Sequence, residues 1–241
     1  EDEFNLPVFI NNDGNLFAYG EALLGFLPYI NERIFKAGGI KQFKNLIGLT
    51  LGTGFGGGIV IDNNLMVGDN SCGAEVHNTI NKFDTNWNAE ESISTRAIQR
   101  IYSKESGIAF SDTLMPKDIA DIANGNLTGN RLGAVEAFRQ FGEALGSSIA
   151  NIVTVVDGLV VLGGGLTAAW DLFSPFMFNE INRKYKHFTG YETDRLSINL
   201  FDLDDERIFR EFAIGNIQSI DIPNTRKRIE FDALPRIGVG V

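Results

Sequence analysis

The stretch that decides the fold reads LIGLTLGTGFGGGIVID and spans residues 46–62. It holds two apolar runs of strand length, Leu46–Leu51 and Gly57–Ile61, with a glycine-rich loop between them. Residues 62–64 supply the turn chemistry for a short third strand. We therefore predict a hairpin meander of consecutive strands at this point of the chain.

The loop of this hairpin, residues 52–57, matches the Gly-x-Gly-x-x-Gly pattern of dinucleotide-binding proteins letter for letter. A dinucleotide site requires a helix directly after the loop, whereas here an apolar strand follows. The context therefore argues for another ligand. Glycines between two strands allow backbone N–H groups to converge on a phosphate, and the Thr53 hydroxyl adds a donor. A glycine-rich bend without a ligand is the alternative.

Helical periodicity and one continuous apolar run alternate downstream of the hairpin. The predicted elements are helices over residues 89–102, 116–123, 131–155 and 168–185, with a strand over residues 159–162. We expect the longest helix to lie across the sheet, because its apolar residues recur at helical spacing. Gly163, Gly164 and Gly165 form the turn from the strand into the last helix, where a flat ligand or a phosphate can approach the backbone. A tight turn without a ligand is equally compatible with these glycines.

Residues 6–10 form a short apolar run near the start of the chain, which predicts a buried strand. A polar turn over residues 11–15 follows it, and the apolar stripe over residues 17–27 predicts a helix after the turn. Asp13 in this turn can present a carboxylate at the mouth of a cleft, as a general base does. Helix capping is the alternative role, because Asp and Asn are favoured at helix N-termini.

Beyond Arg195, short strands alternate with a charged helix near residues 204–212. Residues 217–222 and 228–231 flank a turn-forming segment at residues 223–225, which predicts an appended β-hairpin. The chain as a whole is typical of a single mixed α/β body.

The composition limits the classes of partner. The net charge of -10 over 241 residues repels phosphate backbones and anionic lipids, so we expect neither nucleic acid nor a membrane as a partner. Cys72 has no second cysteine to pair with, and with only His77 and His187 besides, the chain lacks the ligands of a structural zinc site. No run approaches the ~20 apolar residues of a membrane span and the acidic start lacks a signal core, so we expect a cytoplasmic protein.

Glu75 and His77 follow a polar, glycine-bearing loop over residues 68–73. A carboxylate and an imidazole that follow such a loop can bind sugar hydroxyls through charge-assisted hydrogen bonds. Taken singly, each of them is more often a surface or structural residue. The order of the motifs along the chain is therefore more informative than any one of them.

In this order the motifs resemble the ROK family of repressors, open reading frames and kinases, which has the actin-like ATPase fold. Residues 12–15 resemble the family's Asn-Asp-Ala-Asn turn, and residues 49–62 resemble its second phosphate hairpin. Residues 73–77 are similar to its Gly-Glu-x-Gly-His segment, and residues 160–165 to the strand and glycine turn that contact adenosine. The resemblance runs to about Tyr185. It implies a mixed α/β lobe of the actin-like ATPase (ribonuclease H-like) class with packed helices and a C-terminal β-hairpin insertion.

The resemblance implies that the protein phosphorylates a hexose or an N-acetylhexosamine with ATP and Mg²⁺, and that it is a homodimer. Asp13 would be the general base that accepts the proton of the attacking hydroxyl. Asn12, Glu75 and His77 would bind the sugar. The implied nucleotide contacts are Gly52, Thr53, Gly54, Gly163, Gly164 and Gly165. A non-catalytic, sugar-sensing transcriptional regulator or a degenerate sugar-binding protein of the same family is the alternative.

The chain departs from the family pattern at two places in the sugar-binding region. Where the family has a histidine three residues after the glutamate, this chain has Asn78, and His77 lies one residue earlier. The cysteine-rich zinc segment of the family is replaced by residues 81–91, which contain no cysteine, so we expect no zinc.

The family's first phosphate loop would lie before Glu1, and its last helix would lie after Val241. We therefore expect residues 14–241 to be the large C-terminal lobe of a two-lobed sugar kinase, preceded in residues 1–13 by a remnant strand of the first lobe. An insertion near residues 197–235 exceeds the compact family core. Its hairpin is expected either to contact a partner or to be an inert surface feature.

Overall fold

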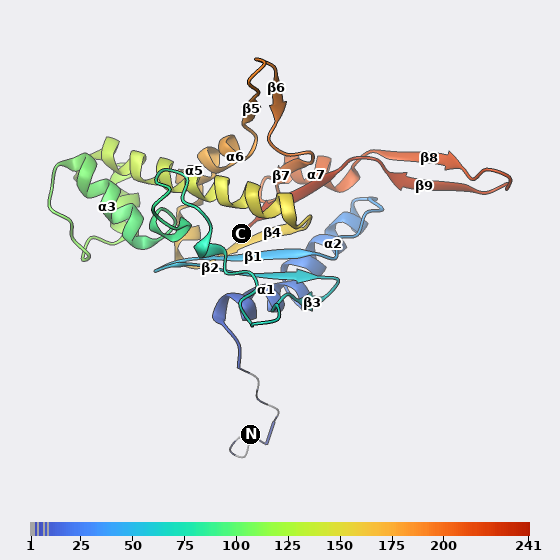
Figure 1. Ribbon diagram of the computed structural model, residues 1–241, viewed down its shortest axis with the longest axis horizontal. Helices are drawn as coiled ribbons and strands as arrows, with labels where there is room; N and C mark the ends of the chain where they lie inside the picture. Colours follow the sequence, from blue (N-terminus) through green and yellow to red (C-terminus); the bar gives the residue numbers. More distant parts are fainter. Residues whose placement is uncertain (1–2, 4, 7, 9) are drawn as a thin grey trace.

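A six-stranded mixed sheet forms the centre of the molecule, in the order β3-β2-β1-β4-β10-β7 (Figure 1). The computed structural model describes residues 3, 5, 6, 8 and 10–241. The strands of this sheet are β1 (Leu46–Leu51), β2 (Phe55–Ile61), β3 (Asn64–Leu65), β4 (Leu159–Gly163), β7 (Asn199–Asp202) and β10 (Arg236–Gly240). β2 is antiparallel to β1 and β3, whereas the neighbours from β1 through β4 and β10 to β7 are parallel. The mixed α/β fold predicted from the sequence is confirmed.

The predicted meander is formed by β1, β2 and β3. β1 and β2 pair from Leu46 opposite Val60 to Leu51 opposite Phe55, so that residues 52–54 join the paired strands. β2 begins two residues before its predicted start. Because a strand and no helix follows the glycine loop, the structure agrees with the rejection of a dinucleotide site.

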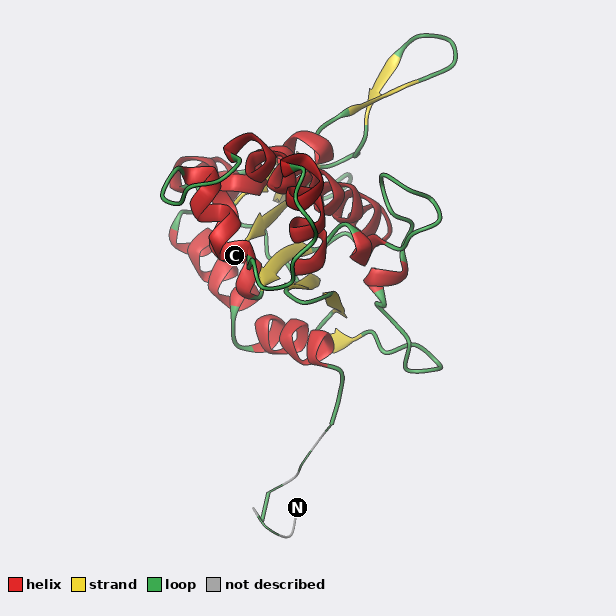
Figure 2. Ribbon diagram, turned by 90° about the vertical axis from the view of Figure 1, so that its left-hand side faces the viewer, coloured by secondary structure: helices red, strands yellow, loops and turns green. Residues whose placement is uncertain are grey.

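Helices cover both faces of the sheet. They are α1 (Asp13–Leu23), α2 (Phe26–Lys36), α3 (Thr95–Ser106), α4 (Pro116–Asn124), α5 (Arg131–Val155), α6 (Trp170–Ile181) and α7 (Glu206–Ile214). Figure 1 shows α5 on one side of the sheet and α1 on the other, and Figure 2 shows helices above and below the strands. α5 has the predicted bounds and packs against α6 through the buried rings of Phe141 and Phe173, whose centroids are 5.2 Å apart.

The first predicted helix is divided in the structure. The stripe over residues 17–27 predicted one helix, but α1 ends at Leu23 and α2 begins at Phe26. The carboxylate of Glu21 accepts a hydrogen bond of 2.7 Å from the N–H of Phe26 and so satisfies the start of the second helix. Leu24, between the two helices, is 91% exposed, so the predicted apolar stripe is wrong at that residue.

Two later helices have shorter bounds than predicted. The helix predicted from residue 89 begins at Thr95, where the hydroxyl of Ser94 caps it. The helix predicted over residues 168–185 ends at Ile181. The residues after it form a small hairpin of β5 (Lys184–Lys186) and β6 (Glu192–Asp194).

The strand predicted over residues 6–10 falls in part on residues outside those that the structure describes. Of its described residues, Leu6, Val8 and Ile10 belong to no strand and expose their side chains. The assignment of residues 1–13 to a first lobe therefore stays a prediction.

The predicted C-terminal hairpin projects from the body as β8 (Ile217–Asp221) and β9 (Arg228–Asp232) (Figure 1). Within the predicted insertion at residues 197–235, β7 belongs to the central sheet and α7 contacts β7. Of this insertion, the β8–β9 hairpin is the part that projects from the body. A buried ion pair holds its root. Asp232 Oδ2 lies 2.5 Å from Nη1 of Arg236, and the two side chains are 4% and 0% exposed.

We expect Asp232→Asn to destabilise the chain by an amount that shrinks in acid. Burial by itself would raise the pKa of the Asp232 carboxyl. Hydrogen bonds from the N–H groups of Asn216 and Leu234 and from Arg236 stabilise the carboxylate more strongly, so the pKa lies below its ordinary value. A carboxyl group with a lowered pKa in the folded state stabilises the fold at pH values above its pKa in the unfolded chain, which is about 3.9. This stabilisation is lost as the pH falls through the pKa that the group has in the folded state. At neutral pH the uncompensated charge of Arg236 should cost about 3–5 kcal/mol. Urea unfolding of both proteins from neutral pH into acid measures the difference, and a difference that does not change with pH would contradict this account.

Candidate active site

A cavity of about 450 Å³ lies between the start of α1 and the glycine loop that joins β1 to β2. It brings together most of the site residues predicted from the sequence. The predicted residues that line it are Asn12, Asp13, Gly52, Thr53, Gly54, Glu75, His77 and Gly164.

Asp13 is the first residue of α1, and the residue before it caps the helix. The side-chain oxygen of Asn12 accepts hydrogen bonds from the N–H groups of Gly14 at 2.9 Å and Asn15 at 3.4 Å. Asn12 and not Asp13 is therefore the N-cap residue of α1, although the Asp13 carboxylate also accepts a hydrogen bond of 2.9 Å from the N–H of Gly14. The side-chain oxygen of Asn12 is used in capping the helix, whereas its side-chain N–H groups can donate to a ligand. The Asp13 carboxylate borders the cavity.

Two glycines let the start of α1 lie directly against β2. A Cβ on Gly14 would lie 2.8 Å from the backbone N and O of Gly57, and a Cβ on Gly58 would lie 2.8 Å from the carbonyl oxygen of Gly14. Real Cβ atoms do not approach so closely, so both positions require glycine. This contact of backbone against backbone is what places Asp13 beside the glycine loop.

The glycine loop is held from outside by the segment that leads into α3. The carbonyl of Gly52 accepts hydrogen bonds from the N–H of Thr95 at 2.9 Å and from its hydroxyl at 3.0 Å. The N–H of Phe55 donates to Oε2 of Glu90 at 3.0 Å. Both ends of the loop are thus fixed by residues about forty positions further along the chain.

Glu90 is a site residue that the sequence analysis missed. Its carboxylate lines the same cavity as Asp13 and Glu75, and a Cβ on Gly54 would lie only 2.4 Å from its Oε2. No local signal marks it, because it lies in a short turn of 3₁₀-helix among other polar residues. Only the fold of the segment before α3 brings it to the cavity.

The electrostatic character of the cavity is acidic. Its lining includes the carboxylates of Asp13, Glu75 and Glu90 and the imidazole of His77, and it contains no Lys or Arg among the residues that the structure describes. An anionic sugar would be repelled there, whereas the hydroxyls of a neutral sugar can donate hydrogen bonds to the carboxylates.

Glu75 and His77 form a pair at the rim of the cavity. Nδ1 of His77 lies 3.1 Å from Oε2 of Glu75, and both side chains are partly exposed. Asn78, which the resemblance aligns with a histidine of the family, is exposed and does not line the cavity. In this chain the imidazole therefore reaches the cavity from the neighbouring position.

The three consecutive glycines 163–165, of which Gly163 ends β4, line different cavities. Gly164 lines the cavity described above, whereas Gly163 lines a cavity of about 780 Å³ beside α1 and α2, and Gly165 one of about 290 Å³ beside α4. Gly164 has a φ of +96°, which L side chains rarely adopt. The predicted adenosine turn thus borders three separate hollows.

Among residues 3, 5, 6, 8 and 10–241, no group of three or more His, Cys, Asp or Glu residues could hold a metal ion. None of the helices formed by those residues combines the length and the apolar character that crossing a bilayer requires.

Comparisons with known proteins agree with the fold and the order of motifs. A family model described as the ROK family matches residues 1–194. A glucokinase from Halalkalibacterium halodurans is 30% identical over 237 residues, which cover 90% of this chain and 62% of the relative. A xylose repressor from Bacillus spizizenii is 28% identical over 169 residues, which cover 67% of this chain and 38% of the repressor.

Among solved structures, the crystal structure of a glucokinase from Parabacteroides distasonis superposes with a TM-score of 0.89 at 44% identity. The match covers 99% of this chain and 64% of that chain. The chain thus spans less than two thirds of the length of each of these proteins.

Proposed function

The chain belongs to the ROK family, and we propose that its protein phosphorylates a hydroxyl group of a neutral hexose or N-acetylhexosamine, with ATP as the phosphoryl donor. The glucokinases among its relatives support kinase activity. The sugar, the activity and the roles of individual residues are parts of this proposal, because the chain spans only part of the length of those relatives.

One observation carries the proposal. The Asp13 carboxylate, the carboxylates of Glu75 and Glu90 and the glycine loop at residues 52–54 border a single cavity. A base, a set of acceptors for hydroxyl groups and a set of backbone N–H donors are the parts that transfer of a phosphoryl group to an alcohol needs.

In the proposed reaction the sugar hydroxyl attacks the γ-phosphorus of ATP. Asp13 accepts the hydroxyl proton as the new P–O bond forms, and the bond from the γ-phosphorus to the bridging oxygen breaks to release ADP. Asn12, Glu75 and Glu90 hold the neighbouring hydroxyls, with His77 supporting Glu75. Positioning supplies most of the rate acceleration, because the reacting atoms must lie in line.

Mg²⁺ is the implied cofactor, and the oxygen-rich lining suits it. Carboxylate oxygens are hard ligands of the kind that Mg²⁺ prefers, and Mg²⁺ in kinases is commonly bound through few carboxylates together with substrate phosphates. When bound, the ion would neutralise charge on the phosphates. The chain's own part is to offer the carboxylates of the cavity and the N–H groups of Thr53 and Gly54, since the N–H of Gly52 donates to the carbonyl of Gly54.

A sugar-sensing regulator is the second candidate, favoured by the match to the xylose repressor. Such a protein would use the same acceptors to bind a sugar without turnover. The net charge of -10 disfavours direct contact of this chain with DNA. Fold alone does not separate the two functions.

The test is a coupled ADP-release assay of the full-length gene product with Mg²⁺-ATP and a panel of hexoses and N-acetylhexosamines. We expect turnover with at least one neutral sugar. Sugar binding measured by calorimetry without any turnover would replace the kinase with the regulator, and no binding of any neutral sugar would overturn both.

A further inference from the structure

We propose that Asn81 and Lys82 are positioning residues, which hold residues 79–91 in the one shape that keeps the Glu90 carboxylate on the glycine loop. The inference deepens the proposed function and rests on it for the role of Glu90 in sugar binding. Glu75 and His77 come immediately before this segment and Glu90 lies near its end, so its shape sets the distance between two sides of the cavity.

Asn81 is the centre of the segment. It is 2% exposed, and its side-chain amide donates to the carbonyl of Asn88 at 2.9 Å and lies 2.9 Å from the hydroxyl of Ser92. Its side-chain oxygen accepts from the N–H groups of Phe83 at 2.9 Å and Asp84 at 3.3 Å. One buried amide thus ties the start, the turn and the end of the segment together.

Backbone hydrogen bonds also join the two ends of the segment 79–91. The N–H of Asn81 donates to the carbonyl of Trp87 at 3.1 Å, and the N–H of Ala89 donates to the carbonyl of Thr79 at 2.8 Å. The segment is therefore a closed loop with its ends together. Buried polar groups that satisfy one another in this way specify a single conformation.

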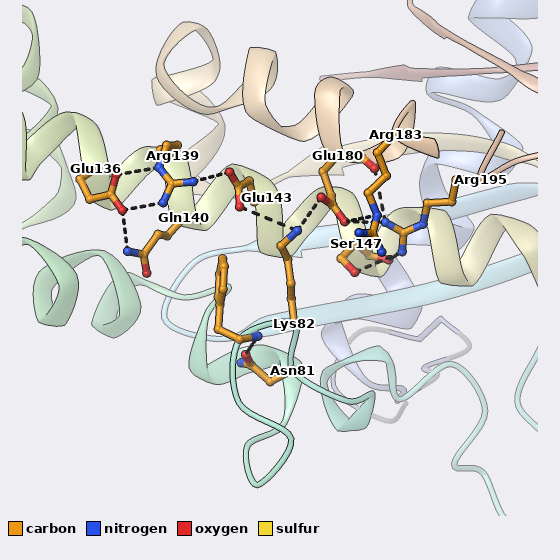
Figure 3. A network of polar contacts seen from close by, with 11 residues as sticks. Asn81, Lys82, Glu136, Arg139, Gln140, Glu143, Ser147, Glu180, Arg183 and Arg195 are labelled. Carbon is orange, nitrogen blue, oxygen red and sulfur yellow. Dashed lines mark hydrogen bonds and ion pairs between the residues drawn. The ribbon is translucent and has the colours of Figure 1, made fainter. Parts of the chain in front are cut away.

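Lys82 fastens the loop to the helices above it. Its Nζ lies 2.5 Å from Oε2 of Glu180 on α6 and 3.8 Å from Oε2 of Glu143 on α5. Figure 3 shows the lysine reaching from the loop to both carboxylates, with Asn81 beside it. Glu180 is 8% exposed and also receives Arg195 at 2.7 Å, so the lysine joins a buried charge network and is no ordinary surface ion pair.

The far end of the loop is fastened separately to α3. Glu91 pairs with Arg96 at 2.5 Å and with Arg100 at 3.2 Å, and the Arg100 guanidinium lies 4.4 Å from the centre of the Trp87 ring. Glu90 therefore stands between two fixed points. When the contacts of Asn81 and Lys82 are removed, the first of these fixed points is lost. The Glu90 carboxylate can then move away from the N–H of Phe55.

The experiment compares Asn81→Ala and Lys82→Met with the matched control Asn86→Ala. Asn86 belongs to the same loop, but it is exposed, and its backbone N–H and side-chain amide both donate to Asp84. The Lys82→Met variant is expected to fold, because Glu180 keeps Arg195 and Arg183 as partners. Lys82→Arg serves as the rescue, since it restores the positive charge.

The first readout needs no activity. Amide hydrogen exchange at Phe55 should accelerate about tenfold in Asn81→Ala and Lys82→Met, while Asn86→Ala and Lys82→Arg should exchange as the wild type does. The thermal midpoint of Lys82→Met should stay within a few degrees of the wild type. Unchanged protection of Phe55 in both variants would overturn the proposal, even if the wild type shows no turnover and the proposed function fails.

The second readout uses the sugar kinetics of the full-length gene product. Asn81→Ala should lower kcat/KM for the sugar about tenfold or more, and it should have no further effect when Glu90 is already alanine. Additive losses would show that Asn81 acts only through general stability, and that outcome would overturn the positioning role.

Discussion

Asp13→Asn is expected to lower the turnover of the full-length gene product by about 10²–10⁴-fold, because an amide cannot accept the proton of the attacking hydroxyl. Sugar binding should change little, since Asn12 caps α1 and so holds the backbone at this position in either variant. The neutral amide has the size of the carboxylate and keeps one acceptor for a hydroxyl. Steady-state turnover and calorimetric sugar affinity, measured on the same protein, separate the two effects.

Asp62→Asn is the matched control for this substitution. Asp62 lies in the turn after β2, where it is exposed and has a φ of +47°, a conformation that asparagine tolerates well. Its variant should keep full turnover. Wild-type turnover in Asp13→Asn would remove Asp13 from the reaction, and a matching loss in Asp62→Asn would point to an indirect effect of charge.

The second large effect is expected from Gly164→Ala, which should destabilise the chain by about 3–5 kcal/mol. Gly164 has a φ of +96°, and a Cβ there would lie 2.3 Å from the carbonyl oxygen of Leu51. Leu51 is paired with Phe55 in the sheet and cannot yield without moving the glycine loop. The thermal midpoint should therefore fall by about 10 °C, and any remaining protein should turn over slowly.

Gly165→Ala tests this explanation one residue away. Gly165 has no positive φ, and a Cβ on it would meet nothing within 4 Å. Its midpoint should stay within about 2 °C of the wild type. Equal losses in the two variants would show that the turn as a whole, and not the contact with Leu51, decides the stability.

Local chemistry made much of the fold predictable. The helix over residues 131–155 was predicted with the bounds it has, because its apolar residues recur at helical spacing. The hairpin at residues 46–61 follows from two apolar runs on either side of glycines. The break at Gly25 was not predictable, because it depends on a bond between the Glu21 side chain and a backbone N–H further along.

The candidate site divides in the same way. The positions of Asp13, Glu75 and the glycine loop follow from motifs that occur in a recognisable order, and the structure places them on one cavity. Glu90 belongs to no motif and reaches the cavity through a segment that Asn81 closes on itself and that Lys82 and Glu91 tie to neighbouring helices.

What the sequence alone determined are the features set by neighbours along the chain: the periods of helices and strands, the turns, and the order of motifs that shows the family. Tertiary structure alone decided that Gly163, Gly164 and Gly165 line different cavities, and that the carboxylate of Glu90 accepts a hydrogen bond from the N–H of Phe55. The physical reason is that periodicity and turn chemistry act over a few residues. The meeting of distant side chains depends on how whole elements pack, and no short stretch of sequence records that.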